Sequence, residues 1–169
     1  MQNIFLCLGS NLDDRLVFLQ SALHHIGELP KTSVLKVSSV YQSEPVGKKD
    51  QPDFLNIVVE IQSDLLPRVL LEQLKSMEAR LGRKQTERWG PREIDIDILY
   101  YDNLVASEHD LTVPHSDVAN RRFVLIPLAE IAPDFRDPVK NLTVSELLKS
   151  CPDQSAVQKT EFSTHLQEH

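Results

Sequence analysis

The stretch IFLCLGSNLDDRLVFLQSALHHIG, residues 4–27, predicts a strand followed by a helix. It begins with an unbroken apolar run that ends at Gly9, as expected of a strand that is buried on both faces. Apolar residues then recur at helical spacing up to Gly27, and Ser10 or Asn11 can cap the start of this helix. The chain therefore opens with a strand that packs against an amphipathic helix.

Two further strands and a second helix follow this unit. Residues 34–41 and 54–61 are rich in β-branched side chains, which favour strands. The second run alternates, so Phe54 and Asn56 are expected on one face and the core on the other. The aliphatic residues of the core face are Leu55, Ile57, Val59 and Ile61. A helix is expected from Pro67 to a stop at Gly82, and residues 94–100 again alternate like a strand.

The order strand, helix, strand, strand, helix, strand is the split βαβ pattern of ferredoxin-like folds. We therefore predict a single α+β domain, in which both helices lie on one face of an antiparallel sheet. Residues 115–149 offer short helices for the other face, including a capping box that begins at Thr143. The predicted domain covers residues 1–150, and the polar tail 151–169 is expected to be poorly ordered.

Composition narrows the class of protein. A chain of 169 residues with 41% hydrophobic content can bury one real core. The 25 acidic residues outnumber the 18 basic ones, which opposes nucleic-acid binding. Apolar runs are too short to span a membrane, and Cys7 and Cys151 suggest neither a disulfide framework nor a zinc site. We expect a cytoplasmic monomer that binds small molecules, without nucleic-acid or membrane partners.

Asp95 and Asp97 are the strongest candidates for metal binding. They lie two apart on a predicted strand, so both carboxylates project from one face with Cα atoms roughly 6–7 Å apart. Mg²⁺ prefers a few carboxylates together with water and phosphate oxygens. An isolated pair of this kind more often faces solvent, but arginines, which suit phosphate, are frequent in the neighbouring sequence. These are Arg83, Arg88, Arg92, Arg121 and Arg122.

The stretch 80–92 contains Trp89 among its arginines, followed by Gly90 and Pro91, and this is typical of a mobile lid over a bound nucleotide. The alternative is a solvated charged loop. His115, after Pro114, can bond phosphate, although a single histidine is more often structural. A P-loop motif is absent from the sequence, and so is a recognisable Ser/His or Cys/His arrangement.

Five motifs occur in an order that resembles one enzyme family: FLCLGSNL, QPDFLN, RWGPREIDIDIL, LTVPH and NRRFVLIPL, within residues 4–134. Together they resemble the 6-hydroxymethyl-7,8-dihydropterin pyrophosphokinases of folate biosynthesis. The resemblance implies a ferredoxin-like fold and transfer of pyrophosphate from ATP to the pterin alcohol, with AMP as the second product. It also implies two Mg²⁺ ions on Asp95 and Asp97.

The resemblance carries further roles onto this sequence. It makes Arg83, Arg92, Asp95 and Asp97 the catalytic residues. The implied ATP contacts are Glu78, Arg88, Trp89, Arg92, Ile98, Thr112, His115 and Arg121. The implied pterin contacts are Ser43, Pro45, Val46, Phe54, Asn56, Trp89 and Phe123, with the ring between the two phenylalanines. Asp110 departs from the pattern, because a basic residue there can contact the nucleotide.

Two other functions are compatible with the residues alone. One is a non-catalytic ferredoxin-like module that binds a ligand on its open sheet face. The other is a Mg²⁺-dependent nucleotide hydrolase without a pterin site. Turnover of ATP that depends on the pterin alcohol distinguishes the transferase from both.

Overall fold

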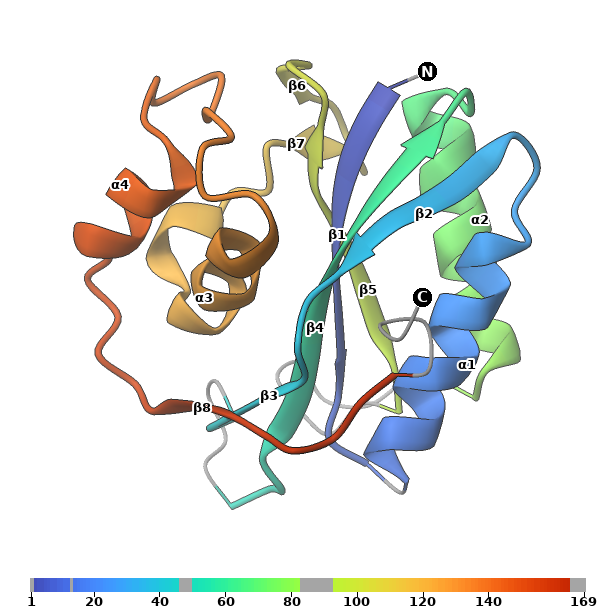
Figure 1. Cartoon of the computed structure of the whole chain (residues 1–169). Helices are drawn as coiled ribbons and strands as arrows, with labels where there is room; N and C mark the ends of the chain where they lie inside the picture. Colours follow the sequence, from blue (N-terminus) through green and yellow to red (C-terminus); the bar gives the residue numbers. More distant parts are fainter. Residues whose placement is uncertain (1, 13, 46–49, 83–92, 165–169) are drawn as a thin grey trace.

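A computed structural model describes residues 2–12, 14–45, 50–82 and 93–164 (Figure 1). Its elements are, in order, β1 (Gln2–Ser10), α1 (Arg15–Gly27), β2 (Thr32–Val37), β3 (Tyr41–Ser43), β4 (Phe54–Ser63), α2 (Pro67–Arg80), β5 (Asp95–Tyr101), β6 (Ala106–Ser107), β7 (Thr112–Val113), the 3-10 helix η1 (Val118–Asn120), α3 (Arg122–Ile131), α4 (Val144–Lys149) and β8 (Val157–Lys159). The main sheet has the order β5-β1-β4-β3-β8, and β2 also pairs with β4.

The predicted ferredoxin-like α+β architecture is confirmed. The central strand β1 pairs antiparallel with β4 on one side and with β5 on the other, and β2 and β3 follow beyond β4. Figure 1 shows α1 and α2 together on one face of this sheet, and α3 and α4 on the opposite side. This arrangement is the split βαβ pattern with two additional helices.

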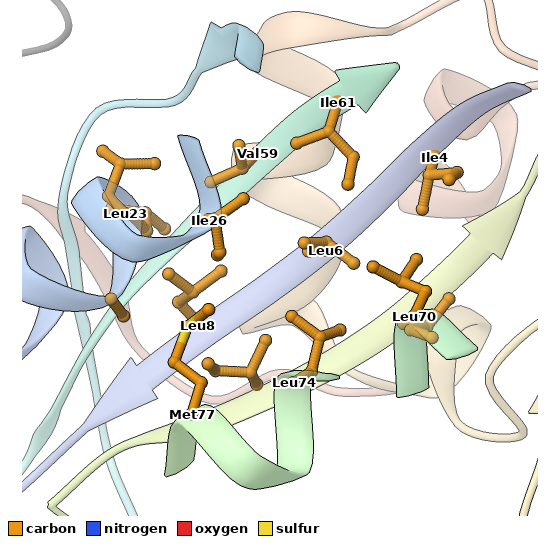
Figure 2. Close-up of a cluster of buried hydrophobic side chains, with 14 of the residues drawn as sticks. Ile4, Leu6, Leu8, Leu23, Ile26, Val59, Ile61, Leu70, Leu74 and Met77 are labelled. Atoms are coloured by element: carbon orange, nitrogen blue, oxygen red, sulfur yellow. The ribbon is translucent and has the colours of Figure 1, made fainter. Parts of the chain in front are cut away.

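The main core lies between the sheet and the pair α1 and α2. Figure 2 shows aliphatic side chains from β1 and β4 pointing toward those of both helices. The alternation predicted for β4 is confirmed, because all four of its expected core residues are 0–1% exposed. The central members of this core are Leu6, Leu8, Leu23, Ile26, Ile57, Ile61, Leu70, Leu74 and Met77.

A second core covers part of the opposite face of the sheet. Phe5 and Tyr100 of the sheet meet Phe135, whose ring centroid lies 4.9 Å from that of Phe5 and 4.8 Å from that of Tyr100. Leu125 and Leu128 of α3 and Leu147 of α4 complete this core.

The predicted capping box of α4 is confirmed, because the side chains of Thr143 and Glu146 each accept a hydrogen bond from the other residue's backbone N–H group. In the part of the chain that the structure describes, no helix combines the length and apolar character needed to cross a membrane.

Two local predictions are wrong. Helix α1 is capped by Asp14, whose Oδ1 accepts from the Val17 N–H at 3.4 Å, rather than by Ser10 or Asn11. The single strand expected over residues 34–41 is divided into β2 and β3. Ser38 lies between them, donating from its N–H to the Val58 carbonyl and accepting from the Val58 N–H through Oγ, both at 2.9 Å. A side-chain oxygen thus replaces the regular backbone ladder at this point.

The prediction of a poorly ordered tail is wrong for residues 151–164, which we call the C-terminal strap. Cys151 is buried, β8 pairs with β3, and Gln20 of α1 donates to the Ser163 carbonyl at 3.4 Å. A polar segment without hydrophobic periodicity is ordered here because backbone hydrogen bonds to a sheet edge hold it. Figure 1 shows the strap passing from α4 along the sheet toward α1.

Candidate active site

A row of three paired residues crosses three neighbouring strands, and its two polar members lie on the face that carries α3 and α4. Asp95 of β5 pairs with Gly9 of β1, and Gly9 pairs with Asn56 of β4. Directly paired residues point to the same face, so the Asp95 and Asn56 side chains share a face with Gly9 between them. Because neighbouring strands are about 4.8 Å apart, roughly 10 Å separates the two backbones.

Asp97 extends this row along β5. It pairs with Cys7, a residue of the second core, so Asp97 faces the α3 side of the sheet as Asp95 does. Both carboxylates are half-buried. The structure therefore places the two predicted metal ligands on one face, as the alternation indicates.

Keeping both Asp95 and Asp97 negatively charged costs free energy when no cation lies near them. Burial raises the pKa of Asp97, and the neighbouring Asp95 carboxylate raises it further. Electrostatic interactions with the basic groups of His115, Lys75 and Arg121 oppose this rise, so all three groups lie close enough to act on Asp97. A cation between the carboxylates would relieve the same repulsion.

The donor set suits a hard cation that keeps ligands of its own. Among the residues described, no group of three or more His, Cys, Asp or Glu side chains is placed to hold a metal. Two carboxylates alone match Mg²⁺, which commonly takes one or two protein carboxylates and completes its shell with water and phosphate. Asp95 and Asp97 thus fit this ion when a phosphate-bearing ligand is present.

His115 and Arg121 border the carboxylates from the loop between β7 and α3. The His115 N–H donates to the Leu99 carbonyl of β5 at 2.9 Å, which fixes the loop beside the strand. Nδ1 of His115 accepts from the Asp117 N–H at 3.1 Å, and Arg121 pairs with the Asp117 carboxylate at 3.1 Å. Asp117 therefore orients two of the residues that sequence analysis assigned to phosphate.

At the other end of the row, Asn56 is held in one orientation. Its side-chain nitrogen donates to Ser43 Oγ at 2.7 Å, and both residues are buried. Gly9 makes room for the amide oxygen, because a β-carbon there would lie 2.8 Å from Asn56 Oδ1. Asn56 and Ser43, which the resemblance assigns to the pterin, are thus in direct contact.

The two predicted stacking residues come from different elements. Phe54 begins β4 and pairs with Ser43, whereas Phe123 lies in the first turn of α3. Both are partly exposed, and they make no ring contact with each other in the described structure. The Arg121 guanidinium lies 5.8 Å from the centre of the Phe123 ring.

Glu78 has a different surrounding from the one expected of an ATP contact. It lies on α2 and is 1% exposed, with Oε2 accepting from the Ile96 N–H at 3.0 Å and Oε1 3.3 Å from Lys75 Nζ. Ile96 stands between Asp95 and Asp97 on a strand that forms the end of the described sheet. This position favours a role in holding β5 over direct contact with a nucleotide.

Ile98 and Thr112 differ in exposure. The Ile98 side chain belongs to the main core beneath the sheet, so an adenine contact would have to use its backbone. Thr112 is exposed in β7, next to the turn that leads to His115.

Among the residues assigned to the pterin, Pro45 is buried directly after β3. The remaining predicted site residues lie outside the described part: Val46, Arg83, Arg88, Trp89 and Arg92.

A family model supplies the decisive comparison. The model for 7,8-dihydro-6-hydroxymethylpterin-pyrophosphokinase (HPPK) matches residues 5–133. The chain belongs to the HPPK family. It is 40% identical over 157 residues to the 2-amino-4-hydroxy-6-hydroxymethyldihydropteridine pyrophosphokinase of Haemophilus influenzae, covering 93% of this chain and 98% of that protein. It is 43% identical to the protein of the same description from Methylorubrum extorquens, covering 95% and 100% respectively.

Solved HPPK structures share the fold. The structure of Plasmodium falciparum HPPK-DHPS with pteroate matches with a TM-score of 0.71 at 16% identity, covering 88% of this chain. The present chain spans 42% of that larger protein. The two curated relatives named above are covered over 98% and 100% of their own length.

Asp110, where the resemblance to the family led us to expect a basic residue, has a partner in the structure. Arg68 of α2 donates to both Asp110 and Glu108 of the hairpin formed by β6 and β7. These contacts hold the pKa of Asp110 below its usual value. The acidic residue thus ties the hairpin to α2.

Sequence reasoning missed two residues that shape this candidate site, Gly9 and Asp117, and one role, the support that Glu78 gives to β5. Gly9 was read only as the end of a strand, although its lack of a side chain admits Asn56. Asp117 and the supporting role of Glu78 depend on contacts between distant elements. Only the first had a local indication, a glycine within an otherwise apolar strand.

Proposed function

We propose that this protein transfers pyrophosphate from Mg²⁺-ATP to 6-hydroxymethyl-7,8-dihydropterin, giving AMP and the pterin diphosphate, in folate biosynthesis. The observation that supports this most strongly is the row across β5, β1 and β4. It places a carboxylate pair at one end and a fixed amide beside an aromatic ring at the other. A spacing of roughly 10 Å suits a substrate whose flat ring and reacting alcohol lie at opposite ends.

At the pterin end, Asn56 is the specificity residue. Its amide is oriented by Ser43, so it meets the polar edge of the ring without reordering. Phe54 and Phe123 would hold the two faces of the ring, a geometry in which aromatic stacking adds to the burial of area. We further assign to this pocket the backbone around Pro45 and Val46, and Trp89 as its cover.

At the phosphate end, Asp95 and Asp97 would hold Mg²⁺, with two ions expected. When bound, Mg²⁺ neutralises charge on the phosphate oxygens and lowers the pKa of the attacking hydroxyl. Arg121 lies beside the same carboxylates and contributes positive charge, and the His115 ring lies beside them as a hydrogen-bonding group. We assign Arg83, Arg88 and Arg92 to the remaining phosphate contacts, with Arg83 and Arg92 acting on the transition state.

The chain's own residues act mainly by positioning. The pterin hydroxymethyl oxygen attacks the β-phosphorus of ATP, and the bond from that phosphorus to the α-phosphate oxygen breaks, so AMP leaves with the bridging oxygen. We assign no general base, so the hydroxyl proton would pass to solvent or to a phosphate oxygen. Such a reaction needs alignment and charge neutralisation more than covalent chemistry.

Measuring AMP with and without the pterin alcohol tests this function. The proposal predicts that AMP appears from Mg²⁺-ATP only when the pterin alcohol is present, in equal amount with a pterin product heavier by two phosphates. Hydrolysis of ATP without pterin would instead indicate a nucleotide hydrolase. An absence of turnover, with pterin still bound, would indicate a binding module.

A further inference from the structure

The C-terminal strap, residues 151–164, contacts both walls of the pocket that is assigned above to the pterin, which we call the pterin slot. One wall is the start of α3, where Arg121 and Phe123 lie, and the other is β3 with Ser43. The HPPK family match ends at residue 133, so the strap lies outside the matched range. The relatives from Haemophilus influenzae and Methylorubrum extorquens, in contrast, align over 157 and 161 residues of this chain, which include most of the strap.

Asp153 of the strap caps the helix that carries Phe123. Its Oδ2 accepts from the N–H of Arg122, the first residue of α3, at 2.9 Å, and the Arg122 guanidinium donates back to the Ser155 carbonyl at 2.9 Å. Helix α3 receives no such bond from its own N-cap residue, Arg121. Burial acts to raise the pKa of Asp153, but hydrogen bonds from Ser155 and Arg122 outweigh it, so the pKa stays below its usual value.

The same segment then holds β3 from its outer side. Strand β8 pairs with β3 in the register Val157 to Ser43 and Lys159 to Tyr41. Beyond it, both the N–H and the hydroxyl of Thr160 donate to the Val40 carbonyl at 2.9 Å. β3 is three residues long, and strands that short need support on both sides to keep one position. Its other side carries the bond from Asn56 to Ser43.

A third contact joins the two walls directly. Glu130, near the end of α3, accepts from Ser39 N–H at 2.8 Å and from the Tyr41 hydroxyl at 3.1 Å. Lys159 of β8 lies 3.9 Å from the same carboxylate. The strap, α3 and β3 thus form a closed set of contacts around the slot, and a shift of the strap would move both walls.

We propose that the C-terminal strap sets the width of the pterin slot, with Asp153 as a positioning residue that acts through Phe123. This inference rests on the proposed function, because it concerns the pocket assigned there to the pterin. Asp153 does not touch the substrate. It fixes where the first turn of α3, and so the Phe123 ring, stands opposite Phe54.

The test compares Asp153→Ala with Asp153→Asn in the full chain. Loss of a helix cap costs about 1 kcal/mol, so Asp153→Ala should raise the pterin Kd and KM about fivefold, with kcat changed less than about twofold. Asp153→Asn keeps an acceptor oxygen and should restore most of the affinity. The control is Asp134→Ala, an exposed carboxylate before α4 for which the described structure has no hydrogen bond or ion pair. It should bind pterin as the unaltered protein does.

The variant Thr160→Pro tests the contact between the strap and β3, independently of Asp153. It removes both bonds to Val40 and should also weaken pterin binding, measured by calorimetry well below the unfolding temperature. Unchanged pterin affinity in both Asp153→Ala and Thr160→Pro would overturn the inference while leaving the proposed function intact. If the unaltered protein binds no pterin, the proposed function fails, and the inference fails with it.

Discussion

Gly9 and Asn56 face each other across β1 and β4 so closely that a β-carbon on Gly9 would lie 2.8 Å from the Asn56 side-chain oxygen. The same β-carbon would lie 3.5 Å from the Phe54 ring. Gly9 therefore matters for the space it leaves open, since the amide can lie against the strand while its nitrogen bonds Ser43.

Gly9→Ala should weaken pterin binding while leaving the binding of an ATP analogue unchanged. The methyl group displaces Asn56 from its orientation, and loss of one such polar contact costs about 1–3 kcal/mol, or roughly 5- to 150-fold in Kd. Titration calorimetry with each ligand measures both effects. Gly27→Ala is the matched control, because its β-carbon would meet only Val34, at an ordinary 3.9 Å. Equal pterin affinity in Gly9→Ala would contradict the position assigned to Asn56.

Asp97→Asn should abolish turnover and yet stabilise the metal-free protein. A metal contact to the reacting phosphates is worth several kcal/mol, so kcat should fall roughly a thousandfold. The half-buried carboxylate is repelled by Asp95, and its neutral amide is not. Steady-state kinetics and thermal unfolding without Mg²⁺ check the two expectations. Full activity in the variant would refute the metal assignment, and a lowered unfolding midpoint would refute the repulsion.

Glu78→Ala should destabilise the protein by about 1–3 kcal/mol, because the buried Ile96 N–H loses its acceptor. Because Ile96 separates the two aspartates, kcat should fall as well. Glu78→Gln keeps an acceptor and should retain most of the stability. Denaturant unfolding and kinetics of both variants provide the measurement, with the exposed Glu72→Ala on the same helix as control. If Glu78→Ala raised only the KM for ATP, direct nucleotide contact would be the better account.

Phe123→Leu should loosen pterin binding without affecting the ATP analogue. Leucine keeps much of the apolar volume but lacks a ring face, and stacking contributes about 0.5–1.5 kcal/mol beyond buried area. The pterin Kd should therefore rise about 2- to 12-fold, whereas Phe123→Tyr should retain the affinity. A leucine variant that binds pterin as tightly as the tyrosine variant would show that the ring does not stack.

Hydrophobic periodicity predicted the elements that form the main core. The alternation of β4 separated Phe54 and Asn56 from the buried aliphatic residues, and the structure keeps that division. It succeeded because one fully buried face allows a single strand register. The placement of Asp95 and Asp97 on a common face followed from the same period.

Features that depend on distant partners escaped prediction. Strand β8 is polar and aperiodic, and its order comes from β3, which lies more than 100 residues earlier in the chain. The break between β2 and β3 depends on Ser38 and Val58, and the position of β5 on Glu78. In each case a hydrogen bond between remote segments decides the local structure, and the neighbouring sequence does not contain that information.

The most direct test of the central claim follows the label from ATP carrying ³²P in its β-phosphate, incubated with Mg²⁺ and the pterin alcohol. The transfer of an intact pyrophosphate predicts that all released label appears in the pterin product, while the AMP formed is unlabelled. Label in free phosphate or free pyrophosphate, with the pterin alcohol recovered unchanged, would contradict the account.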